Sequence, residues 1–356
     1  MSAQPSLREV VIFAPDQGVE IRAALESALF HDGAPILVRE SGSRREVGLR
    51  VPTGIALVVA TSGSSGTPKY VLHSAESILA SAHATHHFLG AKEGERWALR
   101  LPLTHIAGLM VMVRSILLKS PLSDSGEYQA VVPTQLFRAL QDEVLLAELK
   151  LAKAVLVGGG PSEESLVEEA RNSGINVVTT YGMSETAGGC VYNGIPLPGV
   201  AITITGEGRV FIKAPQLALG YLDESPGFQD GGFLTQDLGR WSDQERLEII
   251  GRADEVIISG GIKIALGEIE SRIKSMPQLN DVHLFTRVSA EWGEEIVCAV
   301  ATSEEISLTQ IRDFVAEVMP RESAPRALIL LEEMPLRGIG KPDRDTLRGL
   351  PITEEI

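Results

Sequence analysis

Apolar positions follow two alternating patterns through the first 190 residues of the chain. Short runs rich in branched aliphatic residues predict strands, and the clearest is Ile55–Ala60, a wholly apolar run that is typical of a strand buried on both faces. Between these runs, apolar residues recur at helical spacing, as in Gly18–Leu29. The further predicted strands are Val10–Ala14, Pro35–Val38, Val131–Val132, Val155–Val157 and Val177–Thr179. The further predicted helices cover residues 74–89, 105–118, 134–149 and 162–173. This alternation predicts an α/β domain with mainly parallel sheets.

The pattern changes near residue 195. Short strands separated by turn residues run to about residue 250 and predict a small barrel-like β subdomain. After Arg252 a compact α+β pattern begins. Its predicted strands are Glu255–Ile258, Val282–Arg287 and Glu295–Thr302, and its predicted helices are Leu266–Ser275 and Leu308–Val318. The sequence therefore predicts a large domain over residues 1–252 and a small mobile domain over residues 253–356, joined by a hinge of a few residues.

Composition narrows the class of protein. Of the 356 residues, 44% are hydrophobic and 22% are charged, which is typical of a folded protein and not of a disordered one. The formal net charge of −15 makes the average surface repel nucleic acid, so we expect no nucleic-acid partner, and a bound nucleotide needs a local cluster of amides, Lys and Arg. Cys190 and Cys298 have neither disulfide-framework nor metal-ligand spacing. Because the chain has no apolar run of ~20 residues and no signal-peptide pattern at its start, we expect a cytoplasmic protein with no membrane insertion.

The segment Thr61–Lys69 (TSGSSGTPK), directly after the predicted buried strand, is the most informative for chemistry. Its hydroxyl side chains, two glycines and lysine suit a loop whose amides and hydroxyls wrap around phosphate oxygens. The spacing is not that of a Walker A loop, and Tyr70 follows the lysine. By composition alone, a surface loop rich in Ser and Gly is the alternative. The candidate phosphate-binding residues are Thr61, Ser62, Gly63, Ser64, Ser65, Gly66, Thr67 and Lys69.

Four later segments strengthen the phosphate-binding interpretation. Together with Thr61–Lys69 they resemble, in the same order, the motifs of the adenylate-forming acyl-CoA synthetase superfamily, which also contains peptide-synthetase adenylation domains and luciferases. The four are Tyr181–Thr186 (YGMSET), Thr235–Arg240 (TQDLGR), the hinge segment from Gly251–Asp254 (GRAD) to Gly267–Glu270 (GEIE), and Gly340–Arg344 (GKPDR). The resemblance implies a ligase that uses ATP and Mg²⁺ to convert a carboxylic acid into an acyl-adenylate and then transfers the acyl group to CoA.

The resemblance also implies roles that suit the chemistry of the residues. Glu185 is expected to hold Mg²⁺ against phosphate oxygens, with a surface acid as the alternative, and Thr186 to offer its hydroxyl to the α-phosphate. Tyr181 offers a flat face for adenine, and Gly182 is expected to line both the ATP and the acyl sites. The other expected nucleotide contacts are Gly158, Gly159 and Gly160 beside adenine, Asp237 at the ribose diol and Arg252 at phosphate or ribose, with Asp254 as the hinge residue. Gln236 replaces the glycine that is usual in the third motif.

Lys341 is the predicted catalytic lysine. When a carboxylate attacks the α-phosphate, both reacting groups are negative, so an ammonium between them stabilises the transition state. The flanking glycines and Pro342 predict an exposed loop that moves with the small domain. A lone lysine is usually a solvated surface residue, whereas the GKPDR context favours a catalytic one. With His105 and Glu185, Lys341 completes the expected catalytic set.

The segment Leu101–Lys119 (LPLTHIAGLMVMVRSILLK) is mainly apolar and carries His105 and Arg114. A guanidinium among apolar residues must reach solvent or pair with an anion, because an unpaired buried charge is costly. An internal Asp or Glu partner and an exposed helix face are the alternatives for Arg114, and a structural histidine is the alternative for His105. The segment resembles the 2-succinylbenzoate–CoA ligase branch of the superfamily, the menaquinone-pathway enzymes. This implies that His105 flanks the acyl pocket and that Arg114 binds the second carboxylate of an aryl dicarboxylic acid.

Other functions fit the same motifs. One is an adenylating enzyme for another aryl or medium-chain acid, and another is a catalytically inactive nucleotide-binding relative. About 54 residues precede the strand before the phosphate loop, fewer than in most members of the superfamily, and we expect a homodimer to cover the surface that this leaves.

Overall fold

The computed structural model of the protein describes residues 6–40, 48–62, 68–160, 164–259, 262–279, 281–289, 293–337 and 341–356. The chain divides into two units. The first comprises Met1–Thr203, Phe211–Thr235 and Ser242–Leu247, and the second comprises Ile204–Val210, Gln236–Trp241 and Glu248–Ile356. Because each unit takes several segments of the chain, the single domain boundary at residues 252 and 253 stays a prediction.

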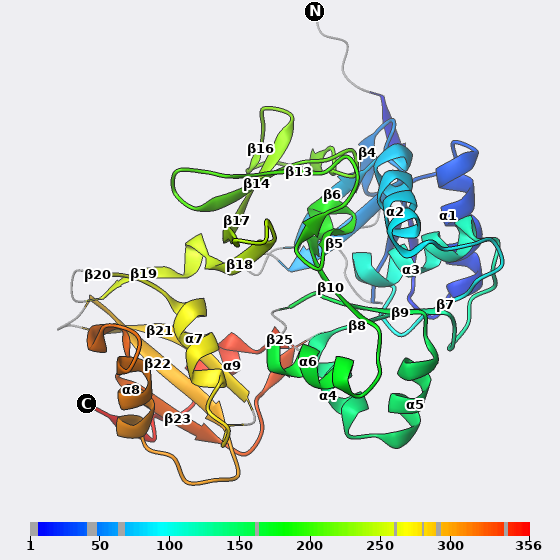
Figure 1. Ribbon diagram of the computed structural model, residues 1–356. Helices are drawn as coiled ribbons and strands as arrows, with labels where there is room; N and C mark the ends of the chain where they lie inside the picture. Colours follow the sequence, from blue (N-terminus) through cyan, green and yellow to red (C-terminus); the bar gives the residue numbers. More distant parts are fainter. Residues whose placement is uncertain are drawn as a thin grey trace, which may run out of the picture. The chain divides into compact units, whose positions relative to one another are not determined.

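The first sheet of the first unit has the strand order β15–β6–β5–β3–β2. Its strands are β2 (Val11–Phe13), β3 (Ile36–Val38), β5 (Leu57–Ser62), β6 (Pro68–His73) and β15 (Gly220–Tyr221). β2, β3 and β5 are parallel, whereas β6 and β15 are antiparallel to their neighbours. Helices α1 (Gly18–Phe30), α2 (Ala75–Leu89) and α3 (Ile106–Leu117) lie together beside this sheet (Figure 1).

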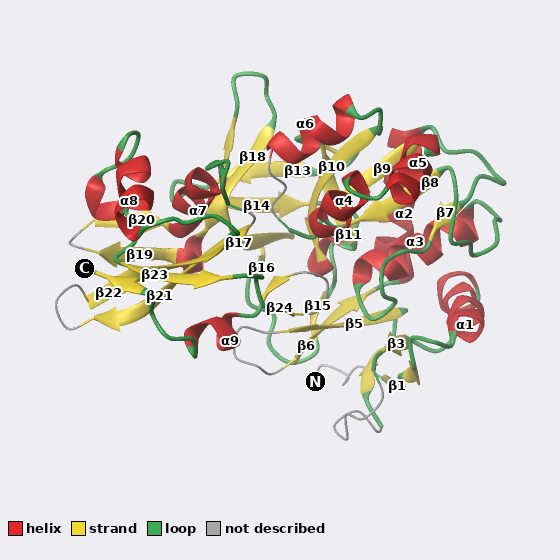
Figure 2. Cartoon of the chain, turned by 90° about the horizontal axis from the view of Figure 1, so that it is seen from below, coloured by secondary structure: helices red, strands yellow, loops and turns green. Residues whose placement is uncertain are grey.

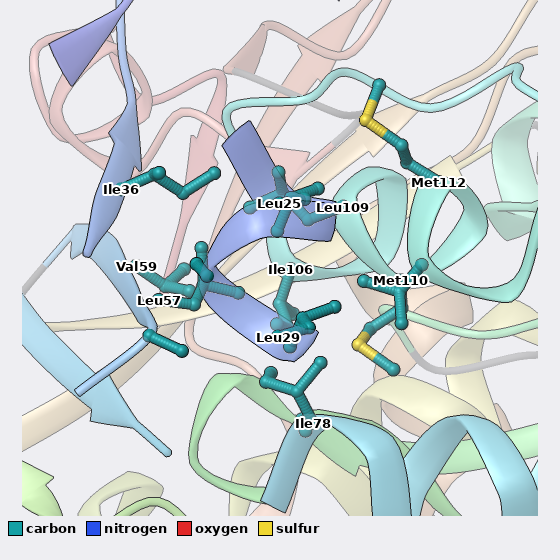
Figure 3. Packing of buried hydrophobic residues seen from close by; sticks show 14 of the residues in the cluster. Leu25, Leu29, Ile36, Leu57, Val59, Ile78, Ile106, Leu109, Met110 and Met112 are labelled. Atoms are coloured by element: carbon teal, nitrogen blue, oxygen red, sulfur yellow. The ribbon is translucent and has the colours of Figure 1, made fainter. Parts of the chain in front are cut away.

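Both faces of the central strand β5 are buried, as its apolar run predicts. Leu57 and Val59 pack in the core that α1, α2 and α3 form with the sheet (Figure 3). Val58 lies in a second core on the opposite face. That core includes Val51 of β4 (Arg50–Pro52), which pairs with β1 (Leu7–Glu9). β5 is therefore fixed from both sides, and the segment that follows it starts from a rigid support.

The second sheet of the first unit has the strand order β12–β11–β10–β9–β8–β7. Its strands are β7 (Trp97–Ala98), β8 (Tyr128–Val131), β9 (Ala154–Val157), β10 (Val177–Met183), β11 (Gly188–Tyr192) and β12 (Ile195–Pro196). β7 to β10 are parallel, and β11 and β12 continue the sheet in the antiparallel sense. The 3₁₀ turn η1 (Ser184–Thr186) joins β10 to β11.

The helix predicted over residues 134–149 is wrong, because the segment forms two helices. They are α4 (Pro133–Leu140) and α5 (Glu143–Leu151). Asp142 lies between them and its carboxylate accepts hydrogen bonds from the backbone N–H groups of Val144 and Leu145 at 2.9 and 3.0 Å, which caps a new helix start. Both helices pack with α6 (Glu164–Asn172) against β8 to β10.

A third sheet occupies the region where the sequence predicts a barrel-like β subdomain. Its order is β13–β14–β17–β16, with β18 also beside β17. The strands are β13 (Ala201–Ile204), β14 (Arg209–Lys213), β16 (Phe228–Gln229), β17 (Gly232–Trp241) and β18 (Leu247–Arg252). The division between the two units passes through these strands.

The rest of the second unit is an α+β fold, as predicted. Its sheet has the order β20–β19–β22–β23–β26, with β21 beside β22, and a separate pair joins β24 and β25. The strands are β19 (Val256–Ser259), β20 (Ile262–Ala265), β21 (Asp281–Ser289), β22 (Gly293–Ala301), β23 (Ala327–Leu331), β24 (Leu336–Arg337), β25 (Lys341–Pro342) and β26 (Glu354–Glu355). The helices and turns are η2 (Ala253–Glu255), α7 (Leu266–Lys274), α8 (Leu308–Ala316), η3 (Arg321–Ser323) and α9 (Arg344–Arg348).

Alternation along β22 gives this sheet two buried faces. Ile296 and Cys298 lie in the core with α7 and α8, whereas Val297 and Ala299 lie in the core with Leu347 of α9. Figure 2 shows α7 and α8 on one side of the sheet and α9 on the other. A short helical segment thus covers the face that the two longer helices leave open.

The predicted α/β class is confirmed, although several of the strands were not predicted. The sequence pattern indicated neither β6, which folds back on β5, nor β23, which runs parallel to β22. Cys190 and Cys298 are both buried, and neither forms a disulfide. In the part of the chain that the structure describes, no helix is both long and apolar enough to span a bilayer.

Gly108 fixes how closely α3 approaches the segment before it. An ideal Cβ at Gly108 would lie 2.3 Å from the Pro102 carbonyl oxygen and 2.7 Å from that of Leu101. We expect Gly108→Ala to push α3 away from this backbone and to lower the free energy of unfolding by about 1–3 kcal/mol, the usual cost of overpacking. Gly206→Ala is the matched control, because an ideal Cβ there meets nothing within 4 Å. Denaturant unfolding measures the difference, and equal midpoints for the two variants would contradict this packing.

Candidate active site

The β5–β6 hairpin holds both ends of the predicted phosphate loop. Thr61 is opposite Lys69 and Ser62 is opposite Pro68 in the antiparallel register. The Thr61 hydroxyl lies 3.4 Å from the Lys69 carbonyl oxygen. Gly63, Ser64, Ser65, Gly66 and Thr67, and the side chain of Ser62, are outside the described residues, so their phosphate contacts stay predictions.

Tyr221 joins the phosphate-loop segment to the segment that carries Glu185. It lies on β15 opposite Val71 of β6. The Lys69 ammonium nitrogen is 5.5 Å from the centroid of the Tyr221 ring, and the Tyr221 hydroxyl donates a hydrogen bond of 2.5 Å to Glu185 Oε1. Burial, with the nearby Glu185 carboxylate, raises the pKa of Tyr221 above its usual range, so the phenol keeps its proton. Sequence reasoning missed Tyr221, because its place in the site depends on a strand pairing with no local signal.

Glu185 has one carboxylate oxygen held and the other available. It lies in η1 and is half-buried, and among the described residues only Tyr221 donates to its side chain. Mg²⁺ in nucleotide sites binds one or two carboxylates together with phosphate oxygens, and its carboxylate ligands are themselves hydrogen-bonded. The described residues contain no cluster of three or more His, Cys, Asp and Glu side chains for a metal, and a site completed by phosphate does not need one. Glu185 therefore fits the Mg²⁺ role.

The Thr186 hydroxyl forms hydrogen bonds within the turn, and its expected contact with the α-phosphate stays a prediction. Its side chain is fully buried, and its hydroxyl donates to the Gly188 carbonyl at 2.7 Å and accepts from the Met183 N–H at 2.9 Å. The neighbouring Ser184 is half-buried, and its hydroxyl has no hydrogen-bond partner within the described part of the chain. Ser184 is thus the hydroxyl beside Glu185 that a phosphate can reach, and sequence reasoning missed it.

The residues expected beside adenine come from neighbouring strands. Gly158, Gly159 and Gly160 follow β9, and Tyr181 and Gly182 lie near the end of β10, which runs parallel to β9. The carboxyl ends of parallel strands meet at one edge of a sheet, so the fold brings these two segments together. The register of β10 against β11 shifts between Tyr181 and Gly182. An ideal Cβ at Gly182 would lie 2.1 Å from the Gly188 carbonyl oxygen, so the close approach of the two strands requires glycine.

Three predicted residues of the second unit meet around one guanidinium. The Arg252 Nε and Nη2 donate to the two carboxylate oxygens of Asp254, each at 2.8 Å, and Nη1 donates to Asp237 at 3.2 Å. The pairing of Arg252 with Asp254 is bidentate, which is the strongest form of arginine–carboxylate pairing. Arg252 therefore links the expected ribose contact Asp237 to the expected hinge residue Asp254.

Lys341 begins the short strand β25, whose backbone pairs with β24. Asp343 follows and caps α9 by accepting from the N–H groups of Asp345 and Thr346 at 3.2 and 3.3 Å. The side chain of Lys341 and residue Gly340 are outside the described residues. The catalytic position of the ammonium stays a prediction.

Arg114 is a buried cation with no acidic partner among the described residues. It lies on α3 and is 4% exposed, with its guanidinium carbon 4.9 Å from the centroid of the Trp97 ring. Its Nε is buried and has no hydrogen-bond partner, and no described Asp or Glu pairs with it. Burial lowers the pKa of Arg114 from its usual value, an effect that Tyr192 partly opposes. Of the two alternatives that the sequence left open, the exposed helix face is wrong, and an acidic partner does not occur among the described residues.

His105 precedes α3, which carries Arg114, and His86 lies on the neighbouring helix α2. His105 is the half-buried residue before the first turn of α3. His86 on α2 accepts a hydrogen bond of 3.3 Å from the Trp97 indole N–H at its Nε2. Burial, with the nearby charge of Arg114, lowers the pKa of His86 to about 4, so it is neutral at pH 7 and adds no second charge. The positive charge in this buried region therefore belongs to Arg114.

His73 at the end of β6 connects the first sheet to the Glu185 turn. It is fully buried, its Nε2 donates to the Ser184 carbonyl at 2.7 Å, and its Nδ1 lies 3.2 Å from the Ser77 hydroxyl. Burial lowers the pKa of His73 to about 4, against the raising effect of the Ser184 carbonyl. The ring is therefore neutral at pH 7.

Comparison with known proteins identifies relatives along most of the chain. The profile of a family described as "AMP-binding enzyme" matches residues 9–120. A probable 2-succinylbenzoate–CoA ligase of Mycobacterium tuberculosis (strain CDC 1551 / Oshkosh) is 36% identical over 330 residues, which cover 85% of this chain and 86% of that protein. A 2-succinylbenzoate–CoA ligase of Enterococcus faecalis (strain ATCC 700802 / V583) is 28% identical over 378 residues, or 94% of this chain and 77% of that protein.

Solved structures have the same fold. An o-succinylbenzoate CoA synthetase (MenE) from Bacillus subtilis, in complex with the acyl-adenylate intermediate OSB-AMP, has a TM-score of 0.78, is 22% identical, and is matched over 97% of this chain and 89% of that one. A variant of E. coli MenE with bound OSB-AMS has a TM-score of 0.71, is 26% identical, and is matched over 90% of this chain and 74% of that one.

The buried neutral His73 makes stability depend on pH. In the unfolded chain its pKa has the ordinary value of 6.5, whereas in the folded protein it is about 4. Below pH 6.5 the unfolded chain therefore binds a proton that the folded protein does not, and the stability present at pH 7 is lost progressively as the pH falls toward 4. We expect this one residue to contribute up to about 3 kcal/mol of the loss. Denaturant unfolding from pH 7 to pH 4 measures it, and His73→Gln should flatten the profile; an equal slope in the variant would contradict the assignment.

Proposed function

The chain belongs to the family of AMP-binding enzymes, and on this premise we propose that it ligates 2-succinylbenzoate to CoA at the expense of ATP, through an acyl-adenylate. Arg114 is the observation that carries the choice of substrate. A buried guanidinium with no acidic partner among the described residues lowers stability, so its presence is best explained by an anion that arrives with the substrate. The M. tuberculosis relative, which matches over most of both chains, supports the same substrate.

In the first step, one oxygen of the succinyl carboxylate attacks the α-phosphorus of ATP. The bond from that phosphorus to the bridging oxygen of pyrophosphate breaks, and pyrophosphate leaves. Lys69, the loop before it and the Ser184 hydroxyl would contact the phosphates, and Glu185, whose Oε1 accepts from Tyr221, would hold Mg²⁺. The metal ion supplies positive charge that neutralises the phosphate oxygens.

Lys341 acts on the same step. As the motif implies, its ammonium would offset the repulsion between the attacking carboxylate and the α-phosphate. Tyr181 and Gly158–Gly160 contact adenine, and Asp237 with Arg252 contacts the ribose. We take residues 253–356 as the mobile domain that brings Lys341 to the site, with Asp254 as the hinge residue.

In the second step the CoA thiol sulfur attacks the acyl carbon. AMP leaves, the thiol proton is released, and 2-succinylbenzoyl-CoA forms. No protein nucleophile takes part. His105, before the first turn of α3, borders the acyl group, and Arg114 on the same helix binds the aryl carboxylate. A cytoplasmic location and a homodimer stay predictions.

Arg114→Met tests the substrate. We expect the KM for 2-succinylbenzoate to rise about 10- to 100-fold, because a charge-assisted hydrogen-bonded contact is worth about 1.5–3 kcal/mol. Activity with monocarboxylates such as benzoate or octanoate should not fall, since they lack the second carboxylate. The melting temperature should stay the same or rise, because the variant removes an unpaired buried charge. ATP-dependent release of pyrophosphate and AMP measures all of these activities.

The matched control for Arg114 is Lys119→Met, which removes an exposed cation that pairs with Glu93 at 3.0 Å. Its KM should not change. An equal loss of activity with every acid would show that Arg114 has a structural role. Turnover with another acid instead of 2-succinylbenzoate would keep the chemistry and overturn the substrate, and no turnover with any acid would favour an inactive relative.

Lys341→Ala tests the chemistry of the first step separately from that of the second. We expect the rate of pyrophosphate formation to fall by about 10²–10³-fold, the usual effect of losing one charge-stabilising donor. The rate at which supplied 2-succinylbenzoyl-adenylate and CoA form the thioester should fall far less, because in that step the thiol attacks the acyl carbon and not the α-phosphorus. Rapid-quench assays of the two steps measure this. Equal losses in both would overturn the assigned role of Lys341.

A further inference from the structure

The turn that carries Glu185 is anchored through its backbone carbonyls by buried side chains. The Ser184 carbonyl accepts from His73 Nε2 at 2.7 Å, and the Ala187 carbonyl accepts from the Ser81 hydroxyl at 2.7 Å. The Gln216 amide donates to the Thr186 carbonyl at 3.4 Å. His73, Ser81 and Gln216 are each 0% exposed. Because a buried carbonyl without a donor is costly, these bonds restrict the turn to one backbone conformation.

Among these anchors, His73 acts nearest to Glu185. The Ser184 carbonyl belongs to the peptide group that ends at the nitrogen of Glu185, and peptide groups are planar. Fixing this carbonyl therefore fixes the position of the Glu185 Cα and, with the anchored Thr186 carbonyl that follows, limits the directions in which its side chain can leave the backbone. At the other end of the side chain, the Tyr221 hydroxyl holds Oε1. His73 and Tyr221 together restrict the orientation of the second carboxylate oxygen.

The hydrogen bonds also define the tautomer of His73. A carbonyl oxygen only accepts, so Nε2 carries the ring proton. In the neutral ring Nδ1 then accepts from the Ser77 hydroxyl, 3.2 Å away. That hydroxyl also donates to the Ser74 carbonyl oxygen at 3.1 Å, so the two acceptors share its one proton. Ser77 thus orients the ring so that its one donor points at the Ser184 carbonyl.

We propose that His73 is a positioning residue for the metal-binding carboxylate of Glu185, acting through the Ser184 carbonyl. This inference rests on the proposed function, in which Glu185 holds Mg²⁺. His73 touches neither nucleotide nor metal. Residues of this kind, one shell behind a metal ligand, typically change metal affinity 10- to 100-fold when they are replaced.

The test compares ATP binding with excess Mg²⁺ and with EDTA, by calorimetry on the full chain. His73→Leu replaces the donor with an apolar side chain. In this variant we expect the ratio of the Kd in EDTA to the Kd with Mg²⁺ to fall about tenfold. The Kd in EDTA should stay unchanged. His73→Gln should keep the ratio near that of the parent protein, because its amide nitrogen can donate to the same carbonyl. A folded His73→Leu with an unchanged ratio, or an equal fall in His73→Gln, would overturn the proposal.

Two further variants separate the possible causes of a change. His283→Asn replaces a buried histidine of the second unit, which pairs with Glu270 at 3.0 Å, and should lower stability without changing the Kd ratio. If His73→Leu does not fold, Ser77→Ala decides, since it frees the ring to turn. A reduced ratio then supports the proposal and an unchanged ratio overturns it.

Glu185→Gln tests the premise independently. In this variant the Kd for ATP should be the same with Mg²⁺ as with EDTA. If Mg²⁺ still lowers the Kd of Glu185→Gln, the metal role of Glu185 in the proposed function is wrong. If Mg²⁺ no longer lowers it but His73→Leu keeps the Kd ratio of the parent protein, the proposed function holds and only the positioning role of His73 fails.

Discussion

The hydrogen bond from Tyr221 to Glu185 is the interaction on which the candidate active site depends. Tyr221 and Glu185 are 36 residues apart, and their side chains meet because β15 adds to the edge of the sheet beside β6. The same pairing puts the Tyr221 ring near the Lys69 ammonium. A hydrogen bond to a carboxylate is worth about 1.5–3 kcal/mol when it is shielded from water, so it is strong enough to select one orientation of Glu185. One strand of two residues thus joins two motifs that belong to different sheets.

Arg114, unlike Glu185, lacks a stabilising hydrogen-bond partner among the described residues. Glu185 has a hydrogen bond that stabilises it before any ligand binds, whereas Nε of Arg114 is buried with no hydrogen-bond partner among the described residues and its guanidinium lies against the face of Trp97. A cation–π contact recovers about 0.5–2 kcal/mol, which is less than the cost of burying an ion. The buried charge of Arg114 therefore lowers the stability of the free protein, and a carboxylate bound as the proposed function has it would supply the missing partner. Such a site discriminates strongly in favour of a substrate with a second acid group.

Much of the fold was predictable because its signals are local. The apolar run at Ile55–Ala60 predicted a doubly buried strand, and the spacing in Gly18–Leu29 predicted α1. The failures share a physical cause, which is competition that only tertiary structure decides. Asp142 caps a new helix where periodicity predicted one continuous helix. Two hydroxyls flank Glu185. That of Thr186 donates to the Gly188 carbonyl, whereas that of Ser184 has no hydrogen-bond partner among the described residues, and the sequence YGMSET does not distinguish the two. Tyr221 and His73 act through partners that are distant in sequence. For the loop residues 63–67 and the Lys341 side chain, the roles still rest on the motifs alone.

Charge distribution explains how a chain with a net charge of −15 can bind two polyanions. Many surface cations are already neutralised, as Lys119 is by Glu93, Arg240 by Glu248 and Arg272 by Glu317. Lys69 and Arg114, by contrast, have no carboxylate partner within the described residues, and each contacts an aromatic face instead. An aromatic ring holds a cation in place without cancelling its charge. Both cations thus keep their charge for the anions that the proposed function assigns to them, a phosphate for Lys69 and a second carboxylate for Arg114. In the proposed function, the binding of anionic ligands follows from the local surroundings of these two cations and not from the total charge.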